Sequence, residues 1–312
     1  MTTNNTQHAH ASQTGAGMDR RAFLKLSGLA TMTMGSMAFL AGCGPAAQGT
    51  SSSTPAATTA AASAGTFAAD GTLRVGMEAA YAPYNWQVTA SSDTTIPIEN
   101  VSGAYADGYD VQIAKKVAEG LGLTPVAVKL EWDGLIEALG KGQIDVIIAG
   151  MTATPERAES IDFTEPYYIG TYGLMVKADS SFANATSIQD FSGAAVLGQK
   201  DTLLDTVIDE IKGVNHLSPV PTVPDQISNL LAGSCDAITF DVGNMASLTS
   251  SRPELKGLVF EEGKGFSETV PVNIGISKGQ DDTVKKMNDI LAGITESDRQ
   301  KIWEAAVARQ PE

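Results

Sequence analysis

Two side chains of opposite charge each follow a predicted strand end, where they could bind a charged ligand. Arg157 comes soon after Thr154-Pro155, a pair typical of a helix start, so its guanidinium would lie in the first helical turn. It would project toward the carboxyl end of the apolar strand predicted at 144–150, and Asp241 ends another predicted strand. Ligands of open α/β sheets bind at such strand ends. A guanidinium fits a carboxylate group, and a carboxylate accepts hydrogen bonds from an ammonium group.

Both residues also have a purely structural interpretation. Arg157 could be a surface residue paired with Glu156 or Glu159, and spacing alone favours that interpretation. Asp241 could be the N-cap of a helix that begins at Val242, a common role for aspartate and one compatible with ligand binding. The residues around these two side chains do not decide between the interpretations.

Few other side chains could carry chemistry. Zinc sites need three or four converging ligands, and downstream of Cys43 only His216 and Cys235 remain. The chain has no GxSxG elbow and no GxxxxGK[ST] loop, and nothing around His216 supports a serine-hydrolase triad. Because the net charge is −15 and no basic patch is visible, nucleic acid is not an expected partner. We therefore expect no catalytic residue, no metal and no cofactor.

The elements that must position Arg157 and Asp241 alternate between strands and helices. The 312 residues suffice for about two domains, and 43% of them are hydrophobic, which is enough for a core. The alternation predicts mainly parallel sheets in two α/β lobes, with 167–177 and 268–277 as candidate strands that cross between them. Predicted strands cover 72–77, 124–132, 144–150, 194–198, 236–241 and 272–277, and predicted helices cover 108–122, 133–142, 202–213, 222–234, 281–293 and 296–308.

The N-terminus has the pattern of an export signal. Arg20 and Arg21 precede a moderately apolar run, Leu26–Gly42, which is slightly short for a membrane-spanning helix of about 20 residues. We therefore expect residues 1–42 to be a signal peptide. The charged start resembles a twin-arginine signal, although Asp19 stands where serine or threonine is usual, so the export route stays open.

The end of this run is similar to a lipoprotein cleavage box, LAGC, in which Cys43 becomes the N-terminus and receives lipid. The alternative is an uncleaved anchor helix that ends in a chance cysteine. Residues 44–69 contain almost only Ala, Ser, Thr, Gly and Pro, so we expect 43–70 to be a lipidated, flexible linker with a root-mean-square reach of ~25–30 Å. Cys235 would then have no disulfide partner, and we expect it to be buried.

Four stretches of the remaining chain are specific enough to indicate a family. They read GMEAAYAPYNW, GYDVQIAKKVAEGLG, EWDGLIEALGKGQIDVIIAGMTATPERAESIDFTEPYY and AGSCDAITFD. Over about residues 71–308 the chain resembles the polar amino-acid family of solute-binding proteins of ABC importers. The resemblance implies an α/β, two-lobe periplasmic-binding-protein-like fold of type II, with two sheets flanked by helices and joined by a two-strand hinge. Lobe 1 would comprise 71–171 plus 273–312, and lobe 2 would comprise 172–272.

The function that the resemblance implies is binding rather than catalysis. A monomer would capture a free amino acid between its lobes and deliver it to an ABC permease and its ATPase. Lipid would hold it at the outer face of the cell membrane, or at the periplasmic side where an outer membrane is present. Two alternatives use the same fold: a periplasmic cyclohexadienyl or prephenate-type dehydratase, which needs a general acid, and a ligand-sensing subunit. Asp241 argues against the dehydratase, whose substrates can lack an ammonium group.

The resemblance also assigns roles to site residues. Arg157, with help from Thr152, would bind the α-carboxylate of the amino acid. Asp241 would bind the ammonium group, aided by the Gly150 carbonyl and the Thr152 hydroxyl. This arrangement is physically sensible because a zwitterion leaves water only when each of its charges gains a partner.

Aromatic residues would contact the side chain of the amino acid. Tyr81 and Trp132 match the positions that sandwich its stem, and aromatic faces also favour cations. We expect Tyr84 and Trp86 to pack the strand instead. Residues 87–108 form a longer polar loop than is usual for the family, and the sequence indicates no role for it.

Two matched positions depart from the family pattern. Thr202 would help to bind the carboxylate, but Asp201 stands before it where glycine is frequent, and its charge would repel a carboxylate unless it points away. Glu78 stands where many relatives have aspartate in contact with the ligand side chain, which favours a polar or cationic amino acid. Relatives that bind basic amino acids often have serines in place of Ala149 and Gly150, so the specificity is not fixed.

Overall fold

The computed structural model describes residues 67–267 and 269–311. The predicted signal peptide at 1–42, Cys43 and most of the predicted linker at 43–70 lie outside the described residues. Within the described ranges, every helix is too short or too polar to cross a bilayer.

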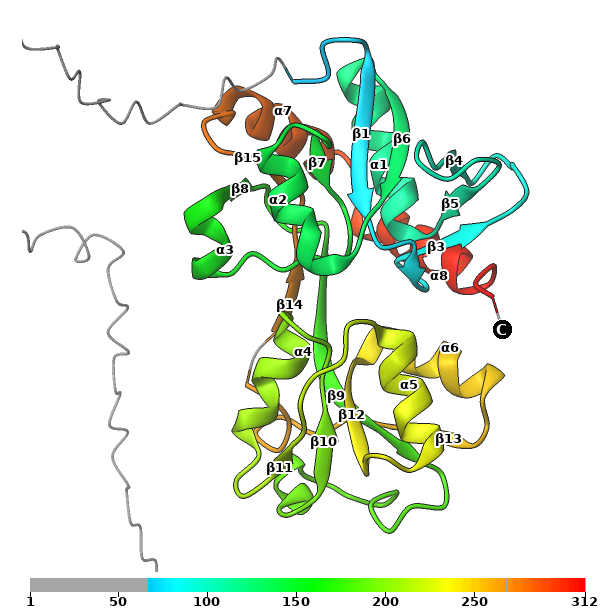
Figure 1. Cartoon of the computed structure of the whole chain (residues 1–312), viewed down its shortest axis with the longest axis vertical. Coiled ribbons are helices and arrows are strands. Elements are labelled where there is room, and N and C mark those ends of the chain that lie inside the picture. The colour runs from blue at the N-terminus through cyan, green and yellow to red at the C-terminus, as the bar shows by residue number, and fades with distance from the viewer. Residues whose placement is uncertain (1–66, 268, 312) are drawn as a thin grey trace, which may run out of the picture. The chain divides into compact units, whose positions relative to one another are not determined.

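The first of three sheets contains five strands and combines parallel with antiparallel pairs. Its order is β6-β1-β7-β15-β8, with β1 parallel to β6 and β7, and β15 antiparallel to β7 and β8. The helices that accompany this sheet along the chain come from residues 109–160 and from the C-terminal part (Figure 1). The strands are β1 (Thr72–Met77), β6 (Thr124–Lys129), β7 (Val146–Ile147), β8 (Ile161–Phe163) and β15 (Gly275–Ser277), and the helices are α1 (Tyr109–Leu121), α2 (Leu135–Gly140), α3 (Pro155–Ser160), α7 (Asp281–Ala292) and α8 (Glu296–Val307).

The second sheet contains six strands, again of mixed direction. Along it, β10 is parallel to β11 and β12, whereas β9 is antiparallel to β12, β13 and β14. The shorter β14 pairs with the first residues of the long strand β9, and Figure 1 shows the two side by side where this sheet connects to the first. The elements are β9 (Tyr168–Lys177), β10 (Ala195–Leu197), β11 (Asn215–His216), β12 (Ala237–Asp241), β13 (Leu255–Leu258), β14 (Thr269–Val272), α4 (Leu203–Thr206), α5 (Val223–Ala232) and α6 (Val242–Ser251).

A third, antiparallel sheet begins before residue 87 and extends through the segment 87–108, which the sequence predicts to be a loop. Its order is β2-β3-β5-β4, and the last three of these strands fall largely within residues 87–108. The loop prediction was therefore wrong: Ile96 and Ala106 are buried, so this segment contributes apolar side chains to the core. The strands are β2 (Ala80–Tyr81), β3 (Asn85–Val88), β4 (Ile96–Pro97) and β5 (Tyr105–Asp107).

The helices form where apolar periodicity and capping residues agree. In α1 the residues at three-to-four spacing, Val111, Ala114 and Val117, are fully buried. Gly122 then ends the helix in the left-handed conformation, with φ 70°, which glycine adopts without strain. In α5 the Thr222 hydroxyl accepts a hydrogen bond from the Asp225 N–H and so caps the first turn. These predicted helices are confirmed.

Three sequence predictions need correction. The sheets are mixed rather than mainly parallel, because β9 and β15 return against their neighbours. The strand predicted at 272–277 is interrupted after Val272, where the chain leaves β9 and joins the first sheet as β15. The helix predicted at 202–213 is only one turn long and continues as a 3₁₀ helix, Val207–Glu210.

Candidate functional site

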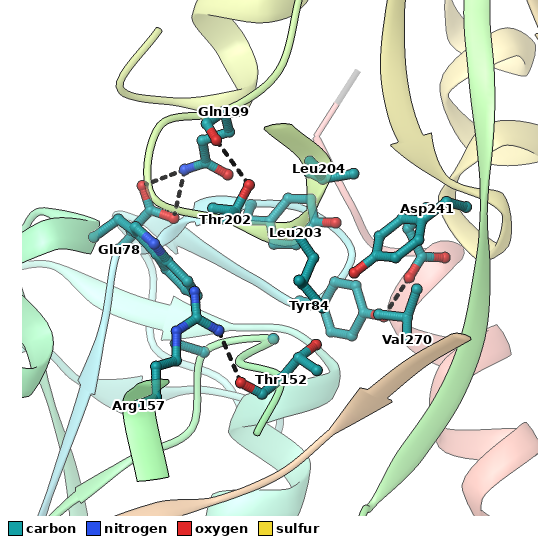
Figure 2. Close-up of a pocket in the computed structure, with 15 residues that line it drawn as sticks. Glu78, Tyr84, Thr152, Arg157, Gln199, Thr202, Leu203, Leu204, Asp241 and Val270 are labelled. Carbon is teal, nitrogen blue, oxygen red and sulfur yellow. Dashed lines mark hydrogen bonds between the residues drawn. The ribbon is translucent and has the colours of Figure 1, made fainter. Parts of the chain in front are cut away.

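All eight residues assigned to a ligand site from the sequence line one pocket of the structure. It encloses a cavity of about 40 Å³, and its walls come from the segments around both larger sheets (Figure 2). Glu78 directly follows β1 and Asp241 ends β12, so both carboxyl groups lie at carboxyl ends of strands, as the rule for open α/β sheets predicts. The eight residues are Glu78, Tyr81, Trp132, Gly150, Thr152, Arg157, Thr202 and Asp241.

Arg157 is positioned by the first turn of α3. Thr154 is the N-cap, and its hydroxyl accepts a hydrogen bond from the Arg157 N–H at 3.2 Å. The guanidinium donates to the carbonyl oxygens of Thr152 and Asp201, each at 2.8 Å, and lies over the Trp132 ring with Cζ 5.2 Å from the ring centroid. Burial lowers the pKa of Arg157, because the surroundings disfavour its charge.

The surface interpretation of Arg157 is wrong. Among the described residues, Arg157 forms no ion pair with Glu156 or Glu159, and its head group turns toward the pocket instead. The site therefore holds a partly buried positive charge whose partners are neutral carbonyl groups.

Asp241 ends β12 and carries the negative charge of the site. The side chain is 1% exposed, and burial raises the pKa of its carboxyl group from 3.8 to about 6. One carboxylate oxygen accepts from the Gly243 N–H at 2.7 Å, so Asp241 is also the N-cap of α6. The other oxygen accepts from the Tyr84 hydroxyl at 2.8 Å. The capping interpretation is confirmed and does not remove Asp241 from the pocket.

A second carboxyl group, Glu78, lies directly after β1. It is 7% exposed, and burial raises its pKa to about 7, with smaller contributions in the same direction from the charges of Glu131 and Asp133. The Gln199 amide nitrogen lies 3.4 Å from both carboxylate oxygens of Glu78 and donates more closely, at 3.0 Å, to the Pro221 carbonyl. Glu78 thus has only weak hydrogen bonding for a buried carboxylate.

The predicted aromatic residues frame the cavity. The Tyr81 ring stacks on Tyr84, with centroids 5.0 Å apart, and the Trp132 indole N–H donates to the Asp201 carbonyl at 3.0 Å. Gly150 lies against Tyr81: a Cβ added at Gly150 would be 3.3 Å from the ring, and its φ of 67° favours glycine. The backbone can therefore approach the cavity closely at this point.

The departure at Asp201 has a simple structural outcome. Asp201 adopts φ 59°, the left-handed conformation in which glycine is common, and its carboxylate is 59% exposed and lies 3.4 Å from the Lys200 ammonium group. The carboxylate therefore does not line the cavity, and only the carbonyl group points to Arg157 and Trp132. The Thr202 hydroxyl donates to the Gln199 carbonyl at 2.8 Å.

Sequence reasoning missed several lining residues, of which Tyr84 matters most. It was expected only to pack, but its hydroxyl reaches Asp241. Trp86 is 3% exposed in the core, as expected. The strand-end rule would have found Gln199, which follows β10 as Asp241 ends β12. Ala149, which the sequence analysis names beside Gly150, also lines the pocket, whereas no sequence signal indicated the remaining lining residues, Tyr172, Leu203, Leu204 and Val270.

Comparisons with known proteins agree on one family. The family described as bacterial extracellular solute-binding proteins, family 3, matches residues 73–305. A probable histidine-binding protein of Campylobacter jejuni is 30% identical over 198 residues, which are 63% of this chain and 71% of the relative. The L-arginine-binding protein of Pseudomonas aeruginosa is 29% identical over 243 residues, which are 76% and 87% of the two chains.

Solved structures show the same fold. The amino acid ABC transporter substrate-binding protein AbpA from Streptococcus pneumoniae, bound to L-arginine, superposes with a TM-score of 0.65 at 22% identity. The match covers 78% of this chain and 97% of the other. The predicted two-lobe α/β fold of type II is therefore confirmed.

Proposed function

This chain belongs to family 3 of the bacterial extracellular solute-binding proteins, and on that premise we propose that it captures a free amino acid between its two lobes. The observation that carries the proposal is the pairing of Arg157 and Asp241 in one pocket. Each is a charge removed from bulk water, and among the described residues neither forms an ion pair with another side chain. A zwitterion supplies both missing counterions at once.

The polar groups match the two ends of an amino acid backbone. At one end, the Arg157 guanidinium binds the α-carboxylate, with Thr152 and Thr202 beside it. At the other, Asp241 accepts hydrogen bonds from the ammonium group, aided by the Gly150 carbonyl and the Thr152 hydroxyl, two residues that line the same pocket. These groups thus bind the α-carboxylate and the ammonium group, which all amino acids share.

Glu78 gives the pocket its preference for a side chain. A carboxyl group with a raised pKa and weak hydrogen bonding gains most from a cationic partner, which restores its ionised form. The faces of Tyr81 and Trp132 favour a cationic or flat side chain between them. We infer that basic amino acids bind more tightly than neutral ones. Relatives named for binding histidine and L-arginine are consistent with this inference.

Closure of two lobes buries the ligand. We assign residues 71–171 plus 273–312 to lobe 1 and 172–272 to lobe 2, with β9 and β14 as the hinge strands. Arg157, Trp132 and Tyr84 from the first lobe hydrogen-bond to Asp201 and Asp241 of the second. These bonds support a closed arrangement in which the amino acid is shielded from water on both sides.

The family is extracellular by its description, and the finer location is part of our proposal. A signal peptide at 1–42 directs export, lipid on Cys43 anchors the protein to the membrane, and the linker at 43–70 lets the body reach an ABC permease. The protein acts as a monomer and changes no covalent bond of its ligand, so we assign it no catalytic residue.

A ligand screen tests the proposal. Thermal unfolding of the purified protein is followed with each of the twenty common amino acids, and calorimetry then gives Kd for those that stabilise it. At 100 times its Kd, a ligand that binds only the folded state adds about 2.7 kcal/mol to the free energy of unfolding. We expect arginine, lysine or histidine to give the largest shift. If no amino acid stabilised the protein, the proposal would be wrong.

A further inference from the structure

The Asp241 carboxylate already has two donors from its own chain, one on each oxygen. The Gly243 N–H comes from the same segment, whereas the Tyr84 hydroxyl comes from the turn between β2 and β3. The hydroxyl and the carboxylate are separated by 157 positions in the sequence. Their bond therefore depends on how the two halves of the fold are brought together.

We propose that Tyr84 is a positioning residue: its hydroxyl fixes the Asp241 carboxylate in the orientation that accepts an ammonium group. This inference rests on the proposed function, since it concerns the same pocket.

Counting lone pairs shows what is left for a ligand. A carboxylate offers about four acceptor sites, two on each oxygen. Gly243 and Tyr84 use one on each oxygen, so one on each remains. An ammonium group with three N–H donors can use these sites and still donate to a neighbouring carbonyl, such as that of Gly150.

The Tyr84 ring is held so firmly that its hydroxyl has a fixed position. The ring is 1% exposed and stacks on Tyr81. It also meets Trp303 edge-on, with centroids 5.1 Å apart, and Tyr168 edge-on at 5.6 Å. A movement of the whole side chain that displaced the hydroxyl would break several of these aromatic contacts, so the hydroxyl positions the carboxylate rather than the reverse.

The same bond influences protonation of Asp241. Burial raises the pKa of Asp241, and the hydrogen bond from Tyr84 opposes this rise because it favours the charged form. Tyr172 lies opposite Asp241 in the register of β9 and β12. The phenols of Tyr81 and Tyr168 also lie near this carboxylate, and burial raises the pKa of both. These two phenols remain neutral near pH 6 and therefore add no charge beside Asp241. Loss of the Tyr84 hydroxyl removes a hydrogen bond that favours the carboxylate, so Asp241 becomes easier to protonate.

The experiment compares Tyr84→Phe with a matched control, Tyr109→Phe. Tyr109 is equally buried and belongs to the same aromatic cluster, but its hydroxyl donates to the Tyr167 carbonyl at 2.9 Å and does not reach Asp241. Each substitution removes one oxygen and keeps the ring. Calorimetry gives Kd of the strongest amino acid found for the wild type, from pH 5 to pH 8, after thermal unfolding has shown that both variants fold.

We expect Tyr84→Phe to weaken binding about tenfold at pH 7.5, the loss typical of a hydrogen bond to a charged group. We also expect the pH at which binding begins to fail to move upward, whereas Tyr109→Phe changes neither quantity. Carboxyl ¹³C NMR of the protein without amino acid should show the Asp241 midpoint rising only in Tyr84→Phe.

Two results would overturn the inference, and they differ. If the wild type binds no amino acid, the proposed function fails and this inference with it, whatever the NMR midpoint shows. If the wild type binds but Tyr84→Phe matches Tyr109→Phe in Kd, in pH profile and in the Asp241 midpoint, the proposed function stands and Tyr84 only packs.

Discussion

The two ends of the pocket each stabilise a charge that is removed from bulk water, but they do so with different groups. At one end, carbonyl oxygens of Thr152 and Asp201 accept hydrogen bonds from Arg157. At the other, a hydroxyl and a backbone N–H donate to Asp241. Both charges are stabilised by dipoles rather than by an opposite charge. A ligand with the complementary charge therefore adds a stronger interaction than the one already present.

The ends differ in whether the charge can be lost. A guanidinium stays protonated at any ordinary pH, so the Arg157 end keeps its charge. The Asp241 carboxyl group, with a pKa of about 6, can take up a proton and become neutral. The Arg157 end should therefore set the strength of binding at every pH, and the Asp241 end should make binding sensitive to acid.

The strongest way to break the comparison is to remove the permanent charge. Arg157→Ala should weaken binding of any amino acid by about 3–5 kcal/mol, because the ligand carboxylate would be buried without a partner. Calorimetry with Arg74→Ala as the control measures this, since Arg74 pairs on the surface with Asp70 and lies outside the pocket. Equal affinities of the two variants would rule out the role of Arg157.

Removal of the titratable charge should have the next largest effect. Asp241→Asn should weaken binding by about 2–4 kcal/mol, because an amide cannot neutralise an ammonium group. Asparagine caps helices as well as aspartate does, so α6 should keep its start. The free energy of unfolding should not fall, because the raised pKa of Asp241 means that its buried charge destabilises the fold above pH 6. Binding that persists at wild-type strength, measured by calorimetry beside an unfolding curve, would contradict the assignment.

A third substitution tests whether side-chain preference is separate from both ends. Glu78→Gln should weaken binding of a basic amino acid by about 1.5–3 kcal/mol, the range for a hydrogen bond to a charged group. Binding of a neutral amino acid such as glutamine should change little and serves as the internal control. An equal loss of affinity for both ligands would instead mean that Glu78 stabilises the pocket as a whole and does not contact the ligand side chain.

Acid should act on the Asp241 end alone when the ligand side chain is neutral. Because the carboxylate is the form that binds ammonium, Kd should rise as the pH falls through about 6 and should be about tenfold higher at pH 5. For a basic ligand the rise should start near pH 7, where Glu78 also takes up a proton. Calorimetry across pH 5–8 measures both profiles, and identical profiles would mean that Glu78 does not contribute to ligand binding.

The pH dependence of ligand binding differs from the pH dependence of the free energy of unfolding. The Asp241 pKa is raised from 3.8 to about 6 in the folded protein, so the folded state holds a proton more tightly than the unfolded chain in that window. Lowering the pH from 6 toward 3.8 therefore stabilises the fold through this group. Weaker binding at pH 5 should accordingly appear without a loss of stability that originates at Asp241.

The smallest effect is expected from an exposed pair at the edge of the cleft. The Lys200 ammonium group lies 3.3 Å from the Asp133 carboxylate, and both side chains are more than half exposed. Water screens such a pair, so Lys200→Gln should change Kd by less than about threefold. A larger change, measured by calorimetry in 0.15 M salt, would mean that exposed charges contribute to closure as buried ones do.

The sequence was most informative where local rules and strand ends coincide. Thr154 and Pro155 start α3 as expected and so place Arg157, and the end of β12 places Asp241. Helices with clear periodicity, such as α1 and α5, have nearly their predicted bounds. Each of these features depends on residues close together along the chain, which is why it could be predicted.

The rest depends on contacts between distant segments. The Tyr84 hydroxyl contacts Asp241 only in the folded chain. In the sequence, a tyrosine after a proline is equally consistent with a residue that only packs. The strands within 87–108 are short and pair with one another across intervening polar residues, so their alternation is too weak to detect. The mixed direction of the sheets likewise follows from where β9 and β15 return, which no local pattern records.

The loop that carries Asp201 meets the other lobe through a backbone oxygen, which two donors share. What must be preserved there is a left-handed backbone angle, not a particular side chain. Glycine or asparagine could replace the aspartate, and the surface charge at the mouth of the cleft could then diverge among descendants of this protein or be altered by design. The hydrogen bonds that join the two lobes at this backbone oxygen would persist through such changes.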